Sequence, residues 1–235
     1  MNEESVLVTR SLHKDFGAAP ALVHAVNGVD LQVRRGETVA VMGPSGCGKS
    51  TLLHLLGGLE RPSAGAVDVA GQPFDRMSEK QLARARRATV GFVFQAFHLM
   101  DELTAVENVE LPALVAGVAP KTARARATAL LEQVGLAGRA TFLPAALSGG
   151  QKQRVGVARS LVNEPTVVLA DEPTGNLDTA ATEDVLRLFG RLRDAGQTLI
   201  LVTHDQRIGD AADRLISMRD GVFVGDTRPP AGREA

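Results

Sequence analysis

The chain has 235 residues, 44% of them hydrophobic and 23% charged, which is ordinary for a globular protein with one large α/β domain or two small ones. The formal net charge of −1 argues against a nucleic-acid partner, because neutralising phosphates needs a clear excess of Lys and Arg. The single cysteine, Cys47, excludes an intrachain disulfide.

The N-terminal sequence MNEESVLVTR is polar and acidic, unlike the basic and then apolar start of a signal peptide. No apolar run approaches the ~18 residues that a spanning helix needs. We therefore expect this chain to contact a membrane only through a partner.

The first part of the chain reads as β-structure. Residues 6–9 form a short apolar run, and Val29, Leu31 and Val33 alternate with polar residues, as in a half-buried strand. Residues 38–42 are continuously apolar, which is typical of a strand covered on both faces. A Gly-rich loop and a leucine-rich helical stretch follow it.

Residues 78–138 are rich in helical patterns. Ala127, Leu130, Leu131 and Val134 share one helix face. The arginines of this region are interpreted mainly as a solvated helix face.

The last third alternates strand and helix again. Residues 167–170 and 199–202 read as buried strands, and an amphipathic helix lies between them. Arg219, Asp220 and Gly221 predict a hairpin turn near the C-terminus. Fully apolar strands that alternate with helices predict a mainly parallel sheet between helical layers.

A phosphate-binding loop is predicted between the strand at 38–42 and the helix after it. The sequence fits GxxxxGK[ST], and both flanks are the required ones. Glycines let successive backbone N–H groups point at phosphate oxygens, and the helix adds its positive N-terminal end. Lys49 is expected at the β- and γ-phosphates and the Ser50 hydroxyl at Mg²⁺. The predicted nucleotide-binding residues of this loop are Gly43, Pro44, Ser45, Gly46, Cys47, Gly48, Lys49, Ser50 and Thr51.

Two acidic residues follow the buried strand at 167–170. Asp171 is expected to hold Mg²⁺, and Glu172 to orient or deprotonate the attacking water. Such a pair alone would equally suit a helix-capping turn; the phosphate-binding loop favours the catalytic interpretation. Cys47, beside Lys49 at a helix N-terminus, is expected to be a reactive thiol.

A second anion-binding helix N-terminus is predicted at residues 147–151, with the sequence LSGGQ. This sequence resembles the signature motif of ATP-binding-cassette (ABC) ATPases. The resemblance implies a head-to-tail dimer, in which one copy's signature contacts the γ-phosphate held by the other copy's Lys49. The residues concerned are Ser148, Gly149, Gly150 and Gln151.

The other ABC motifs match one by one. Gln95 resembles the Q-loop glutamine, which contacts Mg²⁺ and the water and begins the segment facing the membrane subunit. Asp178 resembles the D-loop aspartate that crosses the dimer interface, and His204 the H-loop histidine at the γ-phosphate. Phe16 stands where the family usually has an adenine-stacking aromatic, often Tyr; a core Phe is the alternative.

The resemblance covers nearly the whole chain and is nearest to ATPases of the lipoprotein-release and macrolide-efflux type. It implies a P-loop NTPase core with a mainly parallel sheet and an antiparallel β edge at the N-terminus, in a single ATPase domain over residues 1–225. The core is expected at 1–95 and 160–225, with a helical signature subdomain at about 78–159 and a disordered tail at 226–235.

The implied function is Mg²⁺-dependent ATP hydrolysis that drives a separately encoded transmembrane permease. The ATPase subunits would form a homodimer or a heterodimer, peripheral on the cytoplasmic side of the cell membrane. The apolar residues after Gln95 (Phe97, Leu99, Met100 and Leu103) are expected to face the permease. The alternative is a soluble ABC ATPase, such as one of iron–sulfur assembly.

Overall fold

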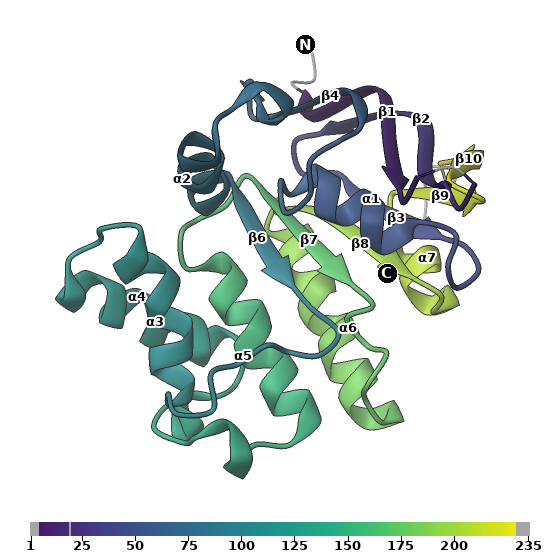
Figure 1. Cartoon of the computed structure of the whole chain (residues 1–235). Helices are drawn as coiled ribbons and strands as arrows, with labels where there is room; N and C mark the ends of the chain where they lie inside the picture. Colours follow the sequence, from purple (N-terminus) through teal and green to yellow (C-terminus); the bar gives the residue numbers. More distant parts are fainter. Residues whose placement is uncertain (1–4, 19, 229–235) are drawn as a thin grey trace.

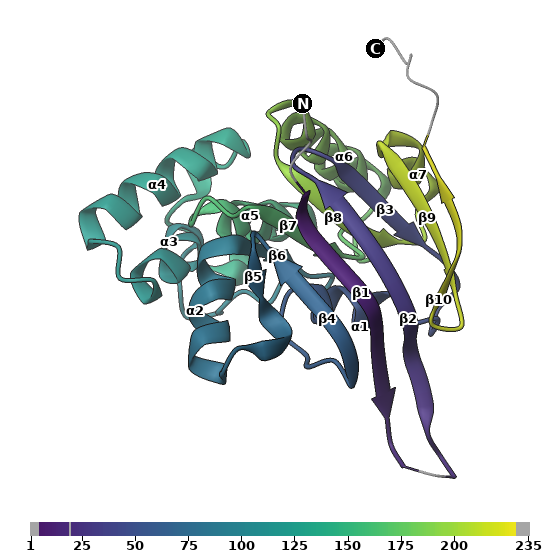
Figure 2. The same cartoon turned by 90° about the horizontal axis from the view of Figure 1, so that it is seen from above.

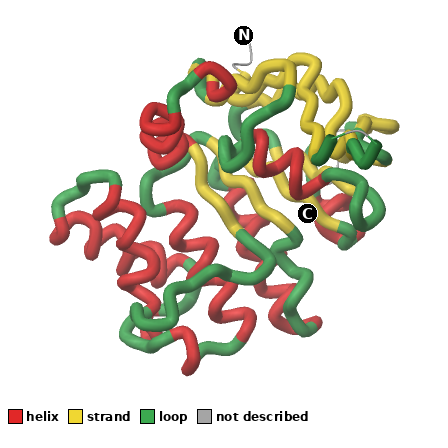
Figure 3. The backbone as a smooth tube through the Cα atoms, viewed as in Figure 1, coloured by secondary structure: helices red, strands yellow, loops and turns green. Residues whose placement is uncertain are grey.

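The computed structural model describes residues 5–18 and 20–228. The strands lie together in one part of the molecule, and a group of helices lies beside them (Figure 1). Colouring by secondary structure separates the strand-rich half from the helix-rich half (Figure 3). The fold is therefore α/β with an added helical part, as the sequence predicts.

The central sheet has six strands in the order β10-β9-β3-β8-β7-β6. β3, β6, β7, β8 and β9 run parallel to one another, and only β10, at the edge beside β9, is antiparallel among these six strands. All six residues of β8 are buried, because layers cover both faces of the sheet. The strands are β3 (Thr38–Met42), β6 (Val90–Val93), β7 (Val167–Asp171), β8 (Thr198–Thr203), β9 (Arg214–Arg219) and β10 (Val222–Thr227).

A second, antiparallel sheet confirms the predicted β edge at the N-terminus. Its order is β2-β1-β4-β5, formed by β1 (Ser5–Phe16), β2 (Val23–Arg34), β4 (Ala64–Val69) and β5 (Gln72–Pro73). Val29, Leu31 and Val33 on β2 are buried, so the predicted alternation is confirmed. The far end of the β1–β2 hairpin extends away from the body of the molecule (Figure 2).

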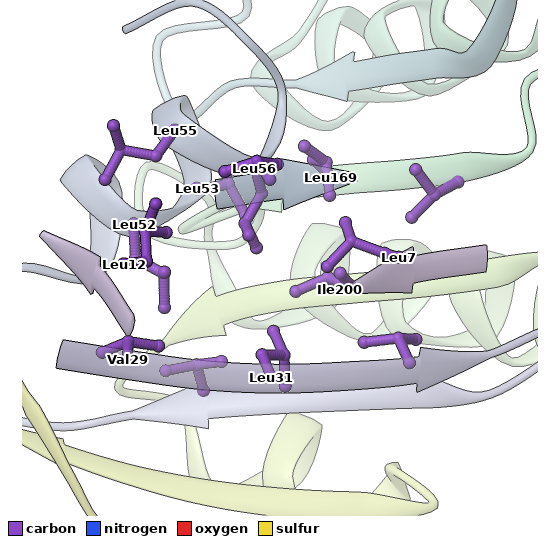
Figure 4. Packing of buried hydrophobic residues seen from close by; sticks show 14 of the residues in the cluster. Leu7, Leu12, Val29, Leu31, Leu52, Leu53, Leu55, Leu56, Leu169 and Ile200 are labelled. Atoms are coloured by element: carbon purple, nitrogen blue, oxygen red, sulfur yellow. The ribbon is translucent and has the colours of Figure 1, made fainter. Parts of the chain in front are cut away.

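Helix α1 (Lys49–Leu56) lies between the two sheets. Its leucines pack against Leu7 and Leu12 of β1 and Leu169 and Ile200 of the central sheet, in one cluster (Figure 4). Burying one such side chain contributes about 1.5–3 kcal/mol. This packing holds the N-terminus of α1, and therefore the loop before it, in a fixed place. The buried leucines of α1 are Leu52, Leu53, Leu55 and Leu56.

The helices between residues 79 and 161 pack into two different hydrophobic clusters. Helix α2 begins near the predicted boundary at residue 78, but it precedes β6, and its Leu82 and Ala85 pack in the same cluster as α1. Apolar spacing identifies a helix face but does not say which core that face joins. Between β6 and β7 lie three α-helices, α3, α4 and α5, with two 3₁₀ turns. The helices are α2 (Glu79–Thr89), α3 (Ala105–Val115), α4 (Pro120–Gln133), α5 (Gly149–Leu161), α6 (Thr179–Asp194) and α7 (Gln206–Ala211), with 3₁₀ turns η1 (Phe74–Arg76), η2 (Ala137–Arg139) and η3 (Pro144–Ala146).

The predicted C-terminal hairpin is present. Asp220 and Gly221 turn with φ of +48° and +79°, a conformation that suits a two-residue hairpin loop. The disordered tail was expected from residue 226, but Asp226 and Thr227 pair with β9, and an ion pair joins Asp226 Oδ2 to Arg214 Nη2 at 2.6 Å. The remainder of that expected tail, 229–235, lies outside the described residues. Within the described part of the chain, none of the helices combines the length and the apolar character that crossing a membrane requires.

Candidate active site

The phosphate-binding loop joins β3 to α1 and is fitted tightly between other strands. Gly48 caps α1 with φ +103°, and a Cβ there would lie 2.0 Å from Ala25 O. A Cβ on Gly43 would lie 2.1 Å from Met218 O. No side chain caps α1, so the first N–H groups of this helix are free of side-chain acceptors. This is the arrangement of an anion-binding helix N-terminus.

Lys49 extends across the inside of this loop. Its side chain is buried, and Nζ donates to Gly43 O at 2.8 Å and to Pro44 O at 3.0 Å. An ammonium has three donors, and the third meets only the Cys47 sulfur at 4.0 Å, a weak acceptor that a phosphate oxygen would replace. The lysine is thereby held where an anion in the loop would meet its charge.

Cys47 does not fit the prediction of a reactive thiol. The residue is only 4% exposed, and its Sγ lies 2.8 Å from the position of a Cβ built on Gly43. Its sulfur is therefore enclosed by the loop, 4.0 Å from Lys49 Nζ. Thiol reactivity requires access as well as a nearby positive charge, and this structure denies the access.

Ser50 and Asp171 meet at the carboxyl end of the central sheet. Ser50 Oγ donates to Asp171 Oδ1 at 2.9 Å. Burial raises the pKa of Asp171, against opposing effects of the Ser50 hydrogen bond, His54 and Lys49. Hydroxyl and carboxylate oxygens are the donors that Mg²⁺ prefers, and a cation would offset the cost of burying the carboxylate charge. These residues therefore fit a Mg²⁺ site that nucleotide oxygens would complete.

Glu172 and His204 form a second pair beside it. Glu172 has φ +43°, an uncommon conformation for a residue with a side chain, and its N–H donates to Val202 O at 2.9 Å. Its Oε2 lies 3.0 Å from His204 Nδ1 and accepts from the His204 N–H at 3.3 Å. The ends of β7 and β8 thus hold a carboxylate and an imidazole together.

Gln95 is tied to a residue whose role the sequence analysis missed. Gln95 Nε2 donates to Asn176 Oδ1 at 3.3 Å, and Asn176 Nδ2 donates to Gln95 O at 3.0 Å. Nothing in the local pattern around Asn176 predicts this pair, because it joins segments 81 residues apart. Gln153 was missed in the same way; it is fully buried and donates to Pro173 O at 2.7 Å.

These groups open onto a cleft of about 550 Å³. Phosphate-loop residues 45–51, Gln95, Glu172 and His204 line it, so the structure brings together residues predicted from four separate motifs. The sequence analysis missed the remaining lining residues, which come from β2 and the β9–β10 turn: Val23, His24, Ala25, Asp220 and Gly221.

Phe16 is not among the residues that line the cleft. It is 41% exposed at the end of β1, opposite Val23 in the hairpin, and Lys14 Nζ lies 4.9 Å from the centre of its ring. The core-residue alternative is therefore wrong. A position beside the lining residue Val23 leaves the ring open to a ligand that protrudes from the cleft.

The signature residues lie outside the cleft. Ser148 caps α5 by accepting from Gln151 N–H at 3.3 Å, and Ser148 N–H donates to Gln151 Oε1 at 3.0 Å. Asp178 caps α6 by accepting from Ala181 N–H at 2.8 Å. Gly149 and Gly150 complete the first turn of α5, where a Cβ on Gly150 would lie 2.7 Å from Ala181 Cβ. The two helix N-termini are thus neighbours, separate from the phosphate-binding loop of their own chain.

Comparison with known proteins gives one consistent result. The family model described as "ABC transporter" matches residues 26–175. The lipoprotein-releasing system ATP-binding protein LolD of Legionella pneumophila is 46% identical over 217 residues, covering 92% of this chain and 96% of LolD. The macrolide export ATP-binding/permease protein MacB 1 of Aeromonas hydrophila is 47% identical over 225 residues, covering 96% of this chain, which spans only 35% of that relative.

A solved structure is similar over nearly the full length of both chains. It is a dimeric, post-hydrolysis state of the ATP-binding cassette MJ0796 bound to ADP and Pi, with a TM-score of 0.87 and 36% identity, covering 94% of this chain and 98% of that one. That similarity includes both the strand-rich lobe and the helical lobe.

Proposed function

Because this chain belongs to the ABC transporter family and is therefore an ABC-type ATPase, we propose that it is the motor of a transport complex, working as a nucleotide-sandwich dimer on a membrane permease. The predicted family, fold class and ATPase activity are confirmed. The relatives found are transporter ATPases, so a soluble iron–sulfur assembly ATPase is not favoured.

The observation that carries the proposal is the division of the predicted residues into two groups. Lys49, Glu172 and His204 surround the cleft, whereas Ser148 and Asp178 begin two helices away from it. Each chain thus carries one complete phosphate-binding loop and one separate anion-binding helix end. A head-to-tail dimer would place each group against the other across ATP, and the similar MJ0796 structure is a dimer.

ATP is proposed to lie with its phosphates in the loop. The N–H groups of residues 45–51 and the ammonium of Lys49 bind and orient the β- and γ-phosphates. Glu172 Oε2 holds the attacking water and draws off its proton, and His204 contacts a γ-phosphate oxygen. Catalysis rests mainly on positioning and on neutralising charge. Phe16 is proposed to stack on the adenine where the base leaves the cleft.

Ser50 and Asp171 are proposed to hold Mg²⁺, with Gln95 close to it. A Mg²⁺ ion held by these residues would supply positive charge that offsets the charge of the phosphates. Gln95 is supported in this place by its paired hydrogen bonds with Asn176.

The partner is proposed to be a transmembrane permease in a separate chain, with this chain peripheral on the cytoplasmic side. The LolD relative, an ATP-binding protein of a lipoprotein-releasing system, supports this, since it matches the present chain over 96% of its own length. The proposed contact is the segment after Gln95. Met100 there is 51% exposed, whereas Leu99 packs against the helical core, so Met100 is the better-supported contact.

The ATPase role is tested with Lys49→Met, which keeps the length of the side chain and removes its charge. We expect kcat/KM for Mg-ATP to fall by more than about 100-fold, because a buried charge and its hydrogen bonds to phosphate are lost. Lys121→Met, on the exposed side of α4, is the matched control and should retain full activity. Equal turnover by the wild type and Lys49→Met would contradict the assignment of this cleft.

A further inference from the structure

The turn after Gln95 contains two consecutive residues in a left-handed conformation. Phe97 has φ +61° and His98 has φ +48°. The His98 N–H donates to Ala96 O at 2.6 Å, which closes a three-residue turn around Phe97. Side chains make this backbone conformation unfavourable, most of all for a bulky residue such as Phe. The turn therefore persists only because its surroundings hold it.

Arg159, near the end of α5, supplies that support. Its Nη2 donates to Phe97 O at 2.7 Å, and its Nη1 donates to His98 O. A planar guanidinium presents parallel donors that suit two neighbouring oxygens, which a lysine ammonium does not. Two carbonyl groups of the strained turn thus accept hydrogen bonds from the same guanidinium.

The environment of Arg159 is costly for a charge. Arg159 is half-buried, and this burial lowers the pKa of its guanidinium. Across residues 5–18 and 20–228, no carboxylate forms an ion pair with Arg159, and its side chain donates hydrogen bonds to the turn alone. A partly buried charge that is not paired with an acid depends on such hydrogen bonds. The turn and the arginine therefore stabilise each other.

Phe97 lies against α5. A Cβ on Gly149 would lie 3.9 Å from the ring atom Cζ of Phe97, and a Cβ on Gly156 would lie 3.9 Å from Phe97 O. Gly149 and Arg159 are ten residues apart, about 15 Å along a helix axis. The turn therefore lies against α5, and Arg159 holds it there.

We propose that Arg159 is a positioning residue that fastens the turn at Phe97 and His98 to α5. The segment that follows Gln95 then moves as one body with the helix that Ser148 begins. This inference rests on the proposed function, in which ATP bound across the dimer acts on Ser148 and the segment after Gln95 contacts the permease. Arg159 is then the connection through which a movement of the signature helix reaches the permease contact.

The first test measures amide hydrogen exchange in the nucleotide-free chain. Arg159→Met removes both donors, and Arg159→Lys keeps the charge without the planar fork. We expect amides 96–100 to exchange about tenfold faster in Arg159→Met, as for the loss of charge-assisted hydrogen bonds, and to a smaller extent in Arg159→Lys. The amides of α1 and of residues 152–157 on α5 should be unchanged.

Arg154→Lys is the matched control. Arg154 is on the same helix and donates to one carbonyl, Val134 O, at 3.2 Å, away from the turn. It should leave the exchange of amides 96–100 unchanged. Faster exchange throughout Arg159→Lys, or unchanged exchange of these amides in both Arg159 variants, would overturn the proposal.

The second test separates positioning from general stability through ATP turnover. Arg159→Lys should lower kcat several-fold with KM for ATP unchanged, because Gln95 is displaced while the phosphate loop is not. Adding His98→Gly should recover part of the loss, since glycine adopts φ +48° without strain. A rise in KM alone, or no recovery, would contradict it. A wild-type chain without ATPase activity would defeat the proposed function instead, and the exchange test would still decide the role of Arg159.

Discussion

Replacing Glu172 by Gln should give a chain that binds ATP, hydrolyses it very slowly and dimerises only when ATP is present. The side chain of Glu172 accepts from the His204 N–H and lies 3.0 Å from His204 Nδ1. A glutamine oxygen can accept the same hydrogen bond, so the fold and the phosphate loop should be retained. The variant lacks only the basic carboxylate.

The magnitudes follow from the chemistry at this position. A general base contributes roughly 10²–10⁴-fold to the rate, so turnover should fall by that factor. Ser148 uses an Oγ lone pair to cap α5, which leaves its hydroxyl hydrogen for a γ-phosphate oxygen of the opposite chain. Such a charge-assisted hydrogen bond contributes about 1.5–3 kcal/mol. Two sites per dimer give about 3–6 kcal/mol, or about 10²–10⁴ in the dimer dissociation constant.

Size-exclusion chromatography with light scattering measures this difference directly. We expect dimers of the Glu172→Gln chain with ATP and monomers with ADP, because only the γ-phosphate reaches Ser148. Adding Ser148→Asp should abolish the dimer, since Asp preserves the helix cap but repels phosphate.

The control for lost capping is Ser78→Ala compared with Ser148→Ala. Ser78 caps α2 through the same reciprocal pair with a glutamine, Gln81. Only Ser148→Ala should weaken the dimer. Dimerisation that is equal with ADP, or that survives Ser148→Asp, would refute the two-site reasoning, and retained turnover would remove Glu172 from the role of base.

Three further predictions concern single residues. Burial raises the pKa of Asp171 above its ordinary value of about 4. The protonated carboxyl therefore stabilises the fold fully at a pH below that ordinary value, and this contribution is lost as the pH rises through the raised pKa. Asp171→Asn should therefore raise the melting temperature of the nucleotide-free chain at pH 7 but not near pH 4, and lower Mg-ATP turnover more than about 100-fold; a lower melting temperature at pH 7 would contradict this. Gly48→Ala should lower the free energy of unfolding, measured in urea, by about 2–5 kcal/mol, because its Cβ would lie 2.0 Å from Ala25 O. The control is Gly46→Ala, whose Cβ meets nothing within 4 Å and which should lose only the backbone penalty of about 1–2 kcal/mol. Equal losses in the two variants would refute the clash. Met100→Ser should leave ATPase activity and stability intact and reduce co-purification with the permease, whereas Val115→Ser, equally exposed on α3, should not; a permease that still co-purifies with Met100→Ser would exclude this contact.

The sequence alone determined the class of fold and predicted most residues of the candidate site. Continuous apolar strands at 38–42, 167–170 and 199–202 predict a sheet covered on both faces, and the central sheet contains them. The loop before α1 is recognisable because phosphate binding constrains neighbouring residues in one short stretch. Local requirements of this kind leave a local pattern, which is why roles for Lys49, Ser50 and Ser148 could be predicted without a structure.

Only the tertiary structure decided which distant residues meet. Asn176 pairs with Gln95, Gly221 N–H donates to Cys47 O at 3.0 Å, and Arg159 reaches the turn at Phe97; none of these pairs shares a segment. The same limit applies to α2, because its apolar spacing predicts a buried face without saying what covers it. The exposure of Cys47 likewise depends on the strands packed around its loop, which charge and position along the chain do not specify.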